Sequence, residues 1–292
     1  MSRLFLGLPA PAKLNLFLHV TGRRADGYHD LQSLMVPIAL ADTLDFELRS
    51  DGRIVRSGDI IGPPDNDLCL RAAALLQQAS ATKLGVDILV EKRIPAGSGM
   101  GGGSSDAATT LLALNRLWRL GWRRDQLAAL AVRLGADVPF FLGAGPAIAE
   151  GVGERLTPLA WPVGWCAVIY PQVSVSTREI FSAPELTRST KALTIADFSA
   201  LRDNAIRGGS SAPAVLFGAN DLEPVVRRRY AAVEAAIAHL ARVGPARMTG
   251  SGSAVFALLP SERAAQEAIS GLPAGWQGWA VTSLAEHPLA QW

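Results

Sequence analysis

The first part of the chain alternates apolar and polar side chains with a period of two residues. Between positions 12 and 20 the first set is Leu14, Leu16, Leu18 and Val20, and the intervening set is Lys13, Asn15, Phe17 and His19. This alternation is typical of a strand with two different faces, so Lys13 and Asn15 are expected on the same face. Further β-like runs at 33–40, 43–49 and 86–92 predict a first half rich in antiparallel strands.

Helical patterns separate these runs. In the segment 67–79, Leu68, Ala72, Leu75 and Leu76 share one face of a helix. Two more helices are predicted to begin at Ser105 and at Asp125. This mixture of strands and helices predicts an α+β protein.

A stretch rich in proline and glycine, from Pro158 to Gly164, marks the expected boundary between two domains, 1–160 and 161–292. Beyond it the pattern predicts a small sheet with helices on one face. The expected elements are a strand at 165–170, a helix at about 222–242, two strands around a glycine loop across 247–259, a helix from Ser261 and a last strand at 278–284. The turn-rich segment 202–220 is predicted to be a surface excursion.

The composition narrows the class of protein. Of the 292 residues, 49% are hydrophobic and 18% are charged, which excludes a disordered chain, and a net charge of +2 gives no nucleic-acid footprint. Prolines interrupt the uncharged run 156–177, and the apolar stretch near the start is too short for a signal peptide. Cys69 and Cys166 have apolar neighbours and no metal-binding spacing, so buried thiols in a reducing compartment are expected. We therefore expect a cytoplasmic protein that binds neither nucleic acid nor membrane.

The strongest local signal is the glycine-rich segment from Pro95 to Ser105. Glycine stands at positions 97, 99, 101, 102 and 103, and glycines let a backbone approach a ligand with its N–H groups turned inward. An amphipathic helix follows, with Ser104 or Ser105 as its expected N-cap. Because free N–H groups and the helix dipole both favour anions, the segment predicts a phosphate site. A flexible linker is the weaker alternative, because linkers do not run into capped amphipathic helices.

Three well-known phosphate-binding motifs do not match. A Walker A loop needs a lysine after its last glycine, where this chain has Ser104. The spacing of Gly97, Gly99 and Gly102 satisfies the dinucleotide-binding pattern, but no acidic residue ends a second strand about 20 positions later. The partner motifs of protein kinases are also missing from the sequence.

Two further stretches can complete a site. Asp137 follows a predicted helix in a turn set by Gly135 and Pro139, from which its carboxylate can project into a cleft. A second glycine–serine turn, with Gly250 and Gly252, lies between two predicted strands. Taken singly, the aspartate is equally typical of an ordinary turn, and the two glycines are more typical of a tight turn than of a ligand contact.

Together these motifs resemble those of the GHMP small-molecule kinases. The resemblance lies in PAKLNLFLHV near the start, PAGSGMGGGSSDAA, and MTGSGSAVFAL near the end. Within that superfamily the chain is similar to the 4-diphosphocytidyl-2-C-methyl-D-erythritol kinases in AKLNLFLHVTGRRADGYHDLQSLM, in GADVPFF and in NDLEPVV. The similarity runs from residue 12 to about 259 and so covers most of the chain.

The resemblance implies a two-domain GHMP kinase fold, with an N-terminal domain like domain 2 of ribosomal protein S5 and a ferredoxin-like C-terminal domain. It also implies ATP-dependent phosphorylation of the 2-hydroxyl group of the methylerythritol unit, in the non-mevalonate route to isoprenoid precursors. The implied cofactors are ATP and Mg²⁺, the implied partner is the small-molecule substrate, and both a monomer and a homodimer remain open. In phosphoryl transfer a protein mainly positions the two reactants and places cations around the transferred group. A lysine beside an aspartate fits these two tasks.

The resemblance also assigns roles to individual residues. Lys13 and Asp137 match the catalytic pair. The expected ATP-binding residues are Pro95, Ala96, Gly97, Ser98, Gly99, Met100, Gly101, Gly102, Gly103, Ser104, Ser105, Asn66 and Lys92. The expected substrate-binding residues are Asn15, Tyr28, His29, Thr177 and Phe181, with Tyr28, His29 and Phe181 against the cytosine base. The adenine-side motif departs from the family pattern, so either Asn66 or Asp67 can face the adenine, and Ser105 is a weak candidate for binding Mg²⁺.

Other functions remain as alternatives. One is a GHMP kinase that acts on homoserine, mevalonate or a sugar, and the Tyr28–His29 loop together with Asp137 argues against it. Another is a binding module that has kept the nucleotide site without catalysis, or an RNA-binding relative. The presence of both Lys13 and Asp137 argues against an inactive kinase, and the lack of a basic face with aromatic residues argues against RNA.

Overall fold

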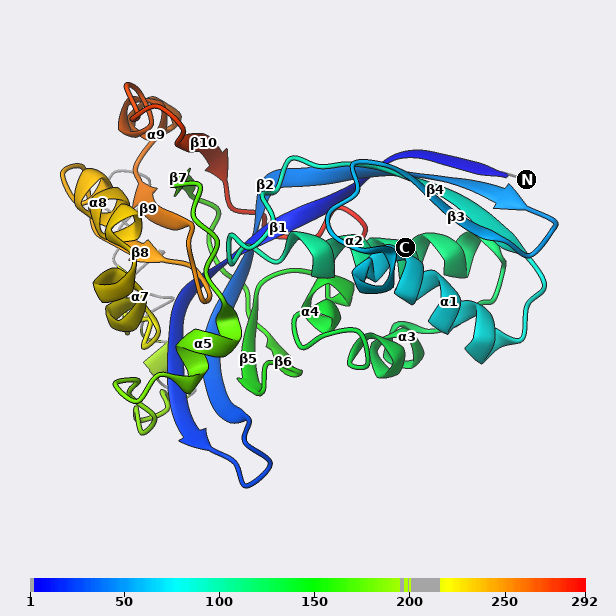
Figure 1. Cartoon of the computed structure of the whole chain (residues 1–292), viewed down its shortest axis with the longest axis horizontal. Coiled ribbons are helices and arrows are strands. Elements are labelled where there is room, and N and C mark those ends of the chain that lie inside the picture. The colour runs from blue at the N-terminus through cyan, green and yellow to red at the C-terminus, as the bar shows by residue number, and fades with distance from the viewer. Residues whose placement is uncertain (1–2, 195–196, 199, 201–215) are drawn as a thin grey trace.

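The protein contains two β-sheets. Its structure is a computed structural model that describes residues 3–194, 197–198, 200 and 216–292. The first half forms a six-stranded sheet and the second half a four-stranded sheet (Figure 1). The α+β class expected from the sequence is confirmed. Most of the predicted surface excursion, residues 202–215, lies outside the described residues.

A long antiparallel hairpin of β1 (Leu4–Arg23) and β2 (His29–Arg49) runs along the molecule (Figure 1). The other strands of this sheet are β3 (Ile54–Gly58), β4 (Gly85–Glu91), β5 (Ala147–Gly151) and β6 (Arg155–Pro158). Their order is β3–β4–β2–β5–β6, with β1 paired to β2, and only β3 and β4 pair in parallel among the described strands. The first half is therefore rich in antiparallel strands, as predicted.

The sequence suggested two strands, 33–40 and 43–49, where the structure has the single strand β2. The polar residue Asp42 interrupts the apolar pattern there, but it stays inside the ladder, opposite Ala10. Its carboxylate is fully buried and accepts hydrogen bonds from the backbone N–H groups of Arg93 and Ile94. A buried aspartate satisfied in this way does not need to end a strand.

Four helices lie on one side of the first sheet, where the first two contact its strands and the other two pack against those helices (Figure 1). They are α1 (Leu68–Ser80), α2 (Gly102–Leu117), α3 (Arg124–Ala131) and α4 (Val138–Leu142), and a short 3-10 helix, η1 (Pro64–Asn66), precedes α1. The expected N-cap of α2 at Ser104 or Ser105 is wrong. Gly101 takes that position with a φ of 76°, so the helix begins earlier and both serines lie in its first turns.

The second sheet has the order β10–β7–β9–β8 and is antiparallel throughout the described strands. Its strands are β7 (Trp165–Tyr170), β8 (Ala246–Met248), β9 (Val255–Leu259) and β10 (Gln277–Thr282). The helices α5 (Thr177–Ser182), α7 (Glu223–Arg229), α8 (Ala231–Leu240) and α9 (Glu262–Ala268) accompany it.

The single helix expected at about 222–242 is two helices in the structure. Tyr230 separates them with an extended backbone, at φ −127° and ψ 92°. Its N–H ends α7 on the carbonyl of Val226, and its carbonyl receives the N–H of Val233 in α8. The continuous helical pattern hides this break because both helices keep an apolar face on the same core.

The two halves share a core. A central cluster, which includes Leu14, Phe17, Met100, Val168 and Phe256, combines side chains from both sheets. The chain passes from β6 to β7 through residues 159–164. The division into domains 1–160 and 161–292 stays a prediction. Both cysteines are buried free thiols, and burial raises the pKa of each. Among the described residues, no helix combines the length and the apolar character that crossing a bilayer requires.

Candidate active site

Two cavities meet at the glycine-rich loop. The first has a volume of about 380 Å³ and lies between the β1–β2 hairpin, α5 and the second glycine turn. The second, of about 320 Å³, lies over η1, the end of β4 and the start of α2. Four residues line both cavities: Gly97, Gly99, Gly101 and Ser104. Ligands in the two cavities can therefore touch each other at this loop.

Backbone hydrogen bonds hold the glycine loop on two sides. The N–H of Lys13 on β1 donates to the carbonyl of Met100, and the N–H of Ala254 donates to the carbonyl of Ser98. Gly99 has a φ of 79°, and a Cβ placed on it would lie 2.4 Å from the carbonyl oxygen of Thr249. Only glycine fits so close to the second glycine turn, and the two glycine segments found in the sequence are therefore in contact.

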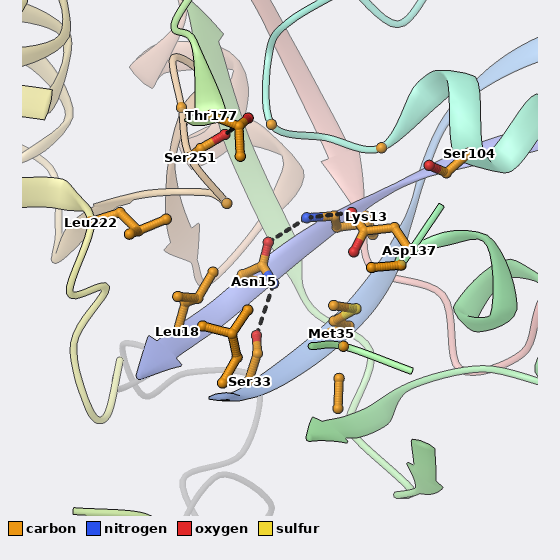
Figure 2. Close-up of a pocket in the computed structure, with 18 of the residues that line it drawn as sticks. Lys13, Asn15, Leu18, Ser33, Met35, Ser104, Asp137, Thr177, Leu222 and Ser251 are labelled. Atoms are coloured by element: carbon orange, nitrogen blue, oxygen red, sulfur yellow. Dashed lines mark hydrogen bonds and ion pairs between the residues drawn. The ribbon is translucent and has the colours of Figure 1, made fainter. Parts of the chain in front are cut away.

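Lys13 and Asp137 come together in the first cavity (Figure 2). Lys13 Nζ lies 3.6 Å from Asp137 Oδ2. The lysine side chain is only 3% exposed, whereas the aspartate, directly before α4, is 33% exposed. A buried ammonium group beside a carboxylate that is still open to solvent can bind and orient a hydroxyl group there.

Asn15 holds the lysine from the other side, as Figure 2 shows. Its Oδ1 accepts hydrogen bonds from Lys13 Nζ and from Thr249 Oγ1, and its Nδ2 donates to Ser33 Oγ. Asn15 lines the first cavity, but its amide is already occupied by these partners. Sequence reasoning missed Ser33 and Thr249. The only signal for Thr249 was its place beside the second glycine turn, and Ser33 becomes visible only from the strand register.

The α5 side of the first cavity carries Thr177 and Phe181. Thr177 Oγ1 lies 2.7 Å from Ser251 Oγ, so the helix and the second glycine turn are joined by a hydrogen bond (Figure 2). Sequence reasoning did not single out Ser251.

Of the three residues expected against the cytosine, Phe181 lines this cavity, whereas Tyr28 and His29 do not. His29 is buried, and its ring centroid lies 5.2 Å from that of Phe181, with an angle of 33° between the planes. Burial, together with the charges of Arg188 and Arg23, lowers the pKa of His29. Tyr28 is 65% exposed and makes no side-chain hydrogen bond to a described residue.

A buried group of three ionisable side chains lies beside the second cavity, and two of them, Lys92 and Asp106, line it. Lys92 Nζ donates to Asp106 Oδ2 at 2.6 Å and also to Asp42 Oδ2. Burial favours the neutral form of Lys92, but the two carboxylates outweigh it and raise the pKa of the lysine. Burial and the nearby Asp42 raise the pKa of Asp106 to about 7, against the opposing effect of Lys92. Neither aspartate was found from the sequence, since each stands in an ordinary-looking element.

The expected adenine-side residues occupy different environments. Asp67 caps α1 by accepting from the N–H groups of Cys69 and Leu70, and it lies 3.3 Å from the guanidinium of Arg56. Asn66 is exposed and lines the second cavity with a side chain that bonds to no described residue. Asn66 is thus the member of the pair that is free to contact a ligand.

Eleven of the thirteen expected ATP-binding residues line the second cavity: Pro95, Ala96, Gly97, Ser98, Gly99, Gly101, Gly102, Gly103, Ser104, Asn66 and Lys92. The other two do not. The side chain of Met100 belongs to the central core, and Ser105 is fully buried with an Oγ that has no hydrogen-bond partner. Of the two serines expected in the ATP site, only Ser104 lines the second cavity.

Comparison with known proteins gives matches over most of the chain. A family model described as the GHMP kinases N terminal domain matches residues 67–145, and one described as GHMP kinases C terminal matches residues 208–278. The 4-diphosphocytidyl-2-C-methyl-D-erythritol kinase of Burkholderia multivorans is 52% identical over 281 residues, which is 96% of this chain and 94% of the relative.

Solved structures agree. A crystal structure of 4-(cytidine 5'-diphospho)-2C-methyl-D-erythritol kinase matches with a TM-score of 0.80 at 40% identity, covering 96% of this chain and 98% of the other. Homoserine kinase from Cytophaga hutchinsonii matches with a TM-score of 0.70 at 16% identity, over 98% and 96% of the two chains. The second similarity shows the fold alone.

Proposed function

The chain belongs to the 4-diphosphocytidyl-2-C-methyl-D-erythritol kinases of the GHMP kinase family, and we propose that it transfers the γ-phosphoryl group of ATP to the 2-hydroxyl group of that substrate. The reaction belongs to the non-mevalonate route to isoprenoid precursors. The observation that carries the proposal is the meeting of two cavities at one glycine loop, with Lys13 and Asp137 in the first.

ATP occupies the second cavity in this proposal, with its phosphates on the glycine loop. The N–H groups of Gly102, Gly103 and Ser104 begin α2 and have no acceptor within the helix, because its first internal bond joins Ser105 to Gly101. Together with the positive end of the helix dipole they favour bound phosphate. The four residues shared by both cavities would then lie beside the γ-phosphate.

The acceptor substrate occupies the first cavity. Its cytidyl end points towards Phe181, where the ring can stack on the base, with His29 behind it. Tyr28, on the exposed loop between β1 and β2, stays a predicted contact of the base. Its 2-hydroxyl group lies at Asp137. The carboxylate takes the hydroxyl proton, the hydroxyl oxygen forms the new bond to the γ-phosphorus, and the bond to the leaving ADP oxygen breaks. The Lys13 ammonium offsets the negative charge on the transferred group.

Mg²⁺ is the cofactor implied by this reaction. The described residues contain no cluster of three or more metal-binding side chains, so the donor set fits an ion held mainly by phosphate oxygens and water. Ser104 lines both cavities, and Asp106 lines the second with a buried Oδ1 that has no hydrogen-bond partner. These two side chains would hold the ion, which supplies positive charge to the phosphates.

Replacement of the proposed base tests the assignment. Asp137→Asn keeps the size of the side chain but removes the proton acceptor, so we expect kcat for the cytidyl substrate to fall roughly 10²- to 10⁴-fold. The affinity for ATP, measured by calorimetry, should change little.

The matched control is Asp125→Asn, an exposed aspartate in the first turn of α3 that pairs only with Arg123 among the described residues. It should keep wild-type kcat. An Asp137→Asn enzyme that folds normally and is as active as this control would refute the role of Asp137.

A further inference from the structure

A single arginine joins the two walls of the cytidyl end of the first cavity. Arg188 follows α5, and its guanidinium donates to the carbonyls of Phe181 at 3.2 Å and Ala183 at 2.6 Å, at the C-terminal end of that helix. It also donates to the carbonyl of Leu186 at 3.0 Å. A further hydrogen bond leads to another element, because Arg188 Nε donates to Nε2 of His29 at the start of β2, at 3.1 Å.

We propose that Arg188 is a positioning residue for the pyrimidine base, which fixes Phe181 and His29 against each other and selects the His29 tautomer with its proton on Nδ1. The inference deepens the proposed function and rests on it for the identity of the ligand. It assigns a role to a residue that does not line the cavity and that sequence reasoning did not single out.

The tautomer follows from the donor inventory. An arginine guanidinium carries only N–H donors and stays protonated, so the His29 nitrogen facing it has to accept. Nε2 is then the unprotonated nitrogen, and the ring proton sits on Nδ1. Burial and the charge of Arg188 both lower the pKa of His29, so both favour the neutral ring that this tautomer requires. Nδ1 makes no hydrogen bond to a described residue, and it can therefore donate to an acceptor atom on a pyrimidine ring.

The geometry of the rings points to the same role. The ring centroids of His29 and Phe181 are 5.2 Å apart, so the polar edge of the imidazole lies beside the aromatic face of the phenylalanine. Arg188 is bonded to the ring of the first and to the backbone of the second. Loss of the guanidinium would free the ring of His29 and loosen the backbone that carries Phe181.

Independent contacts hold the backbone around Arg188. The N–H of Thr190 donates to the carbonyl of Val20 on β1, at 3.0 Å. Further along, the side chain of Gln32 on β2 both donates to and accepts from the backbone of Leu193. Because these bonds do not involve the guanidinium, a variant of Arg188 should keep the course of the segment.

The test uses Arg188→Met, which keeps the length of the side chain and removes every donor. We expect KM for the cytidyl substrate to rise about tenfold or more, with KM for ATP and kcat within about twofold of wild type. Nitrogen-15 NMR of the histidine rings should show a single Nδ1–H tautomer for His29 in the wild type and a mixture in the variant. Arg263→Met, an exposed arginine on α9, is the control and should leave all of these values unchanged.

A double-mutant cycle separates this role from simple support of α5. If Arg188 acts through His29, the substitution Arg188→Met should add little to the KM of a His29→Ala enzyme. Arg188→Lys keeps a positive charge at the end of α5 but lacks the planar set of donors, so it should fold normally and still show the raised KM.

The outcomes are distinct. Unchanged KM for the cytidyl substrate in both Arg188 variants, or full additivity with His29→Ala, would overturn the inference while leaving the kinase activity in place. Absence of turnover by the wild type would instead overturn the proposed function, and the NMR tautomer would then show on its own whether Arg188 controls His29.

Discussion

At the scale of single residues, the two buried lysines of the site have different surroundings. Lys13 faces Asp137, whose carboxylate is one-third exposed, and Asn15, which has other partners. Lys92 faces Asp42 and Asp106, both of which are buried. Removal of a charge is tolerated where water can solvate the remaining partner and is costly where it cannot. The same substitution should therefore affect stability differently at the two lysines, with the smaller loss at Lys13, the proposed catalytic lysine.

Lys13→Met should change the free energy of unfolding by less than about 1 kcal/mol, because Asp137 stays hydrated. It should nevertheless lower kcat about 100-fold or more, since the positive charge at the transferred group is lost. Lys92→Met leaves two buried carboxylates without a cation and should cost about 3–5 kcal/mol. Urea denaturation measures the stabilities and an ADP-release assay the rates. Equal losses of stability in the two variants would contradict this difference.

At the scale of elements, close contacts with the second glycine turn hold the glycine loop in place. Gly99 is pressed against the second glycine turn, whereas Gly121, with a similar φ of 67°, has nothing within 4 Å of a placed Cβ. Both positions disfavour a side chain by their backbone conformation, at about 1–2 kcal/mol. Only Gly99 adds a collision with Thr249 and Gly252.

Gly99→Ala should therefore lower stability more than Gly121→Ala and should also raise KM for ATP, because the loop must move away from the second glycine turn. Gly121→Ala should keep wild-type kinetics and lose only the backbone contribution. Thermal unfolding and steady-state kinetics of the two variants measure the difference. Matching losses in both would show that the loop is not held by this contact.

The periodicity of apolar and polar residues predicted the helices that are bounded by capping or turn residues and the strands in which apolar and polar residues alternate. It divided β2 at Asp42, because burial of a satisfied carboxylate cannot be seen without the backbone that satisfies it. It joined α7 and α8, because the break at Tyr230 keeps the apolar face continuous. It did not identify β3, β5 and β6, whose four or five residues are too short for a period to show.

At the scale of the whole molecule, the site combines residues that are far apart in the sequence. The long β1–β2 hairpin brings Lys13 and Asn15 to the glycine loop, while the second half contributes Thr177 and Ser251 from above (Figure 2). Sequence motifs pointed to Lys13 and Asp137 and to the loop. They could not indicate Arg188, whose role depends on a contact across 159 positions to His29.

The most direct test of the account is an ADP-release assay of the wild-type enzyme with ATP and Mg²⁺ and four alcohols: 4-diphosphocytidyl-2-C-methyl-D-erythritol, homoserine, mevalonate and galactose. The proposed placement of the cytidyl group at Phe181 and His29 predicts a kcat/KM for the cytidyl substrate at least about 100-fold above the others, because only that substrate would use these contacts. Comparable turnover of another alcohol, or no turnover of the cytidyl substrate, would contradict it.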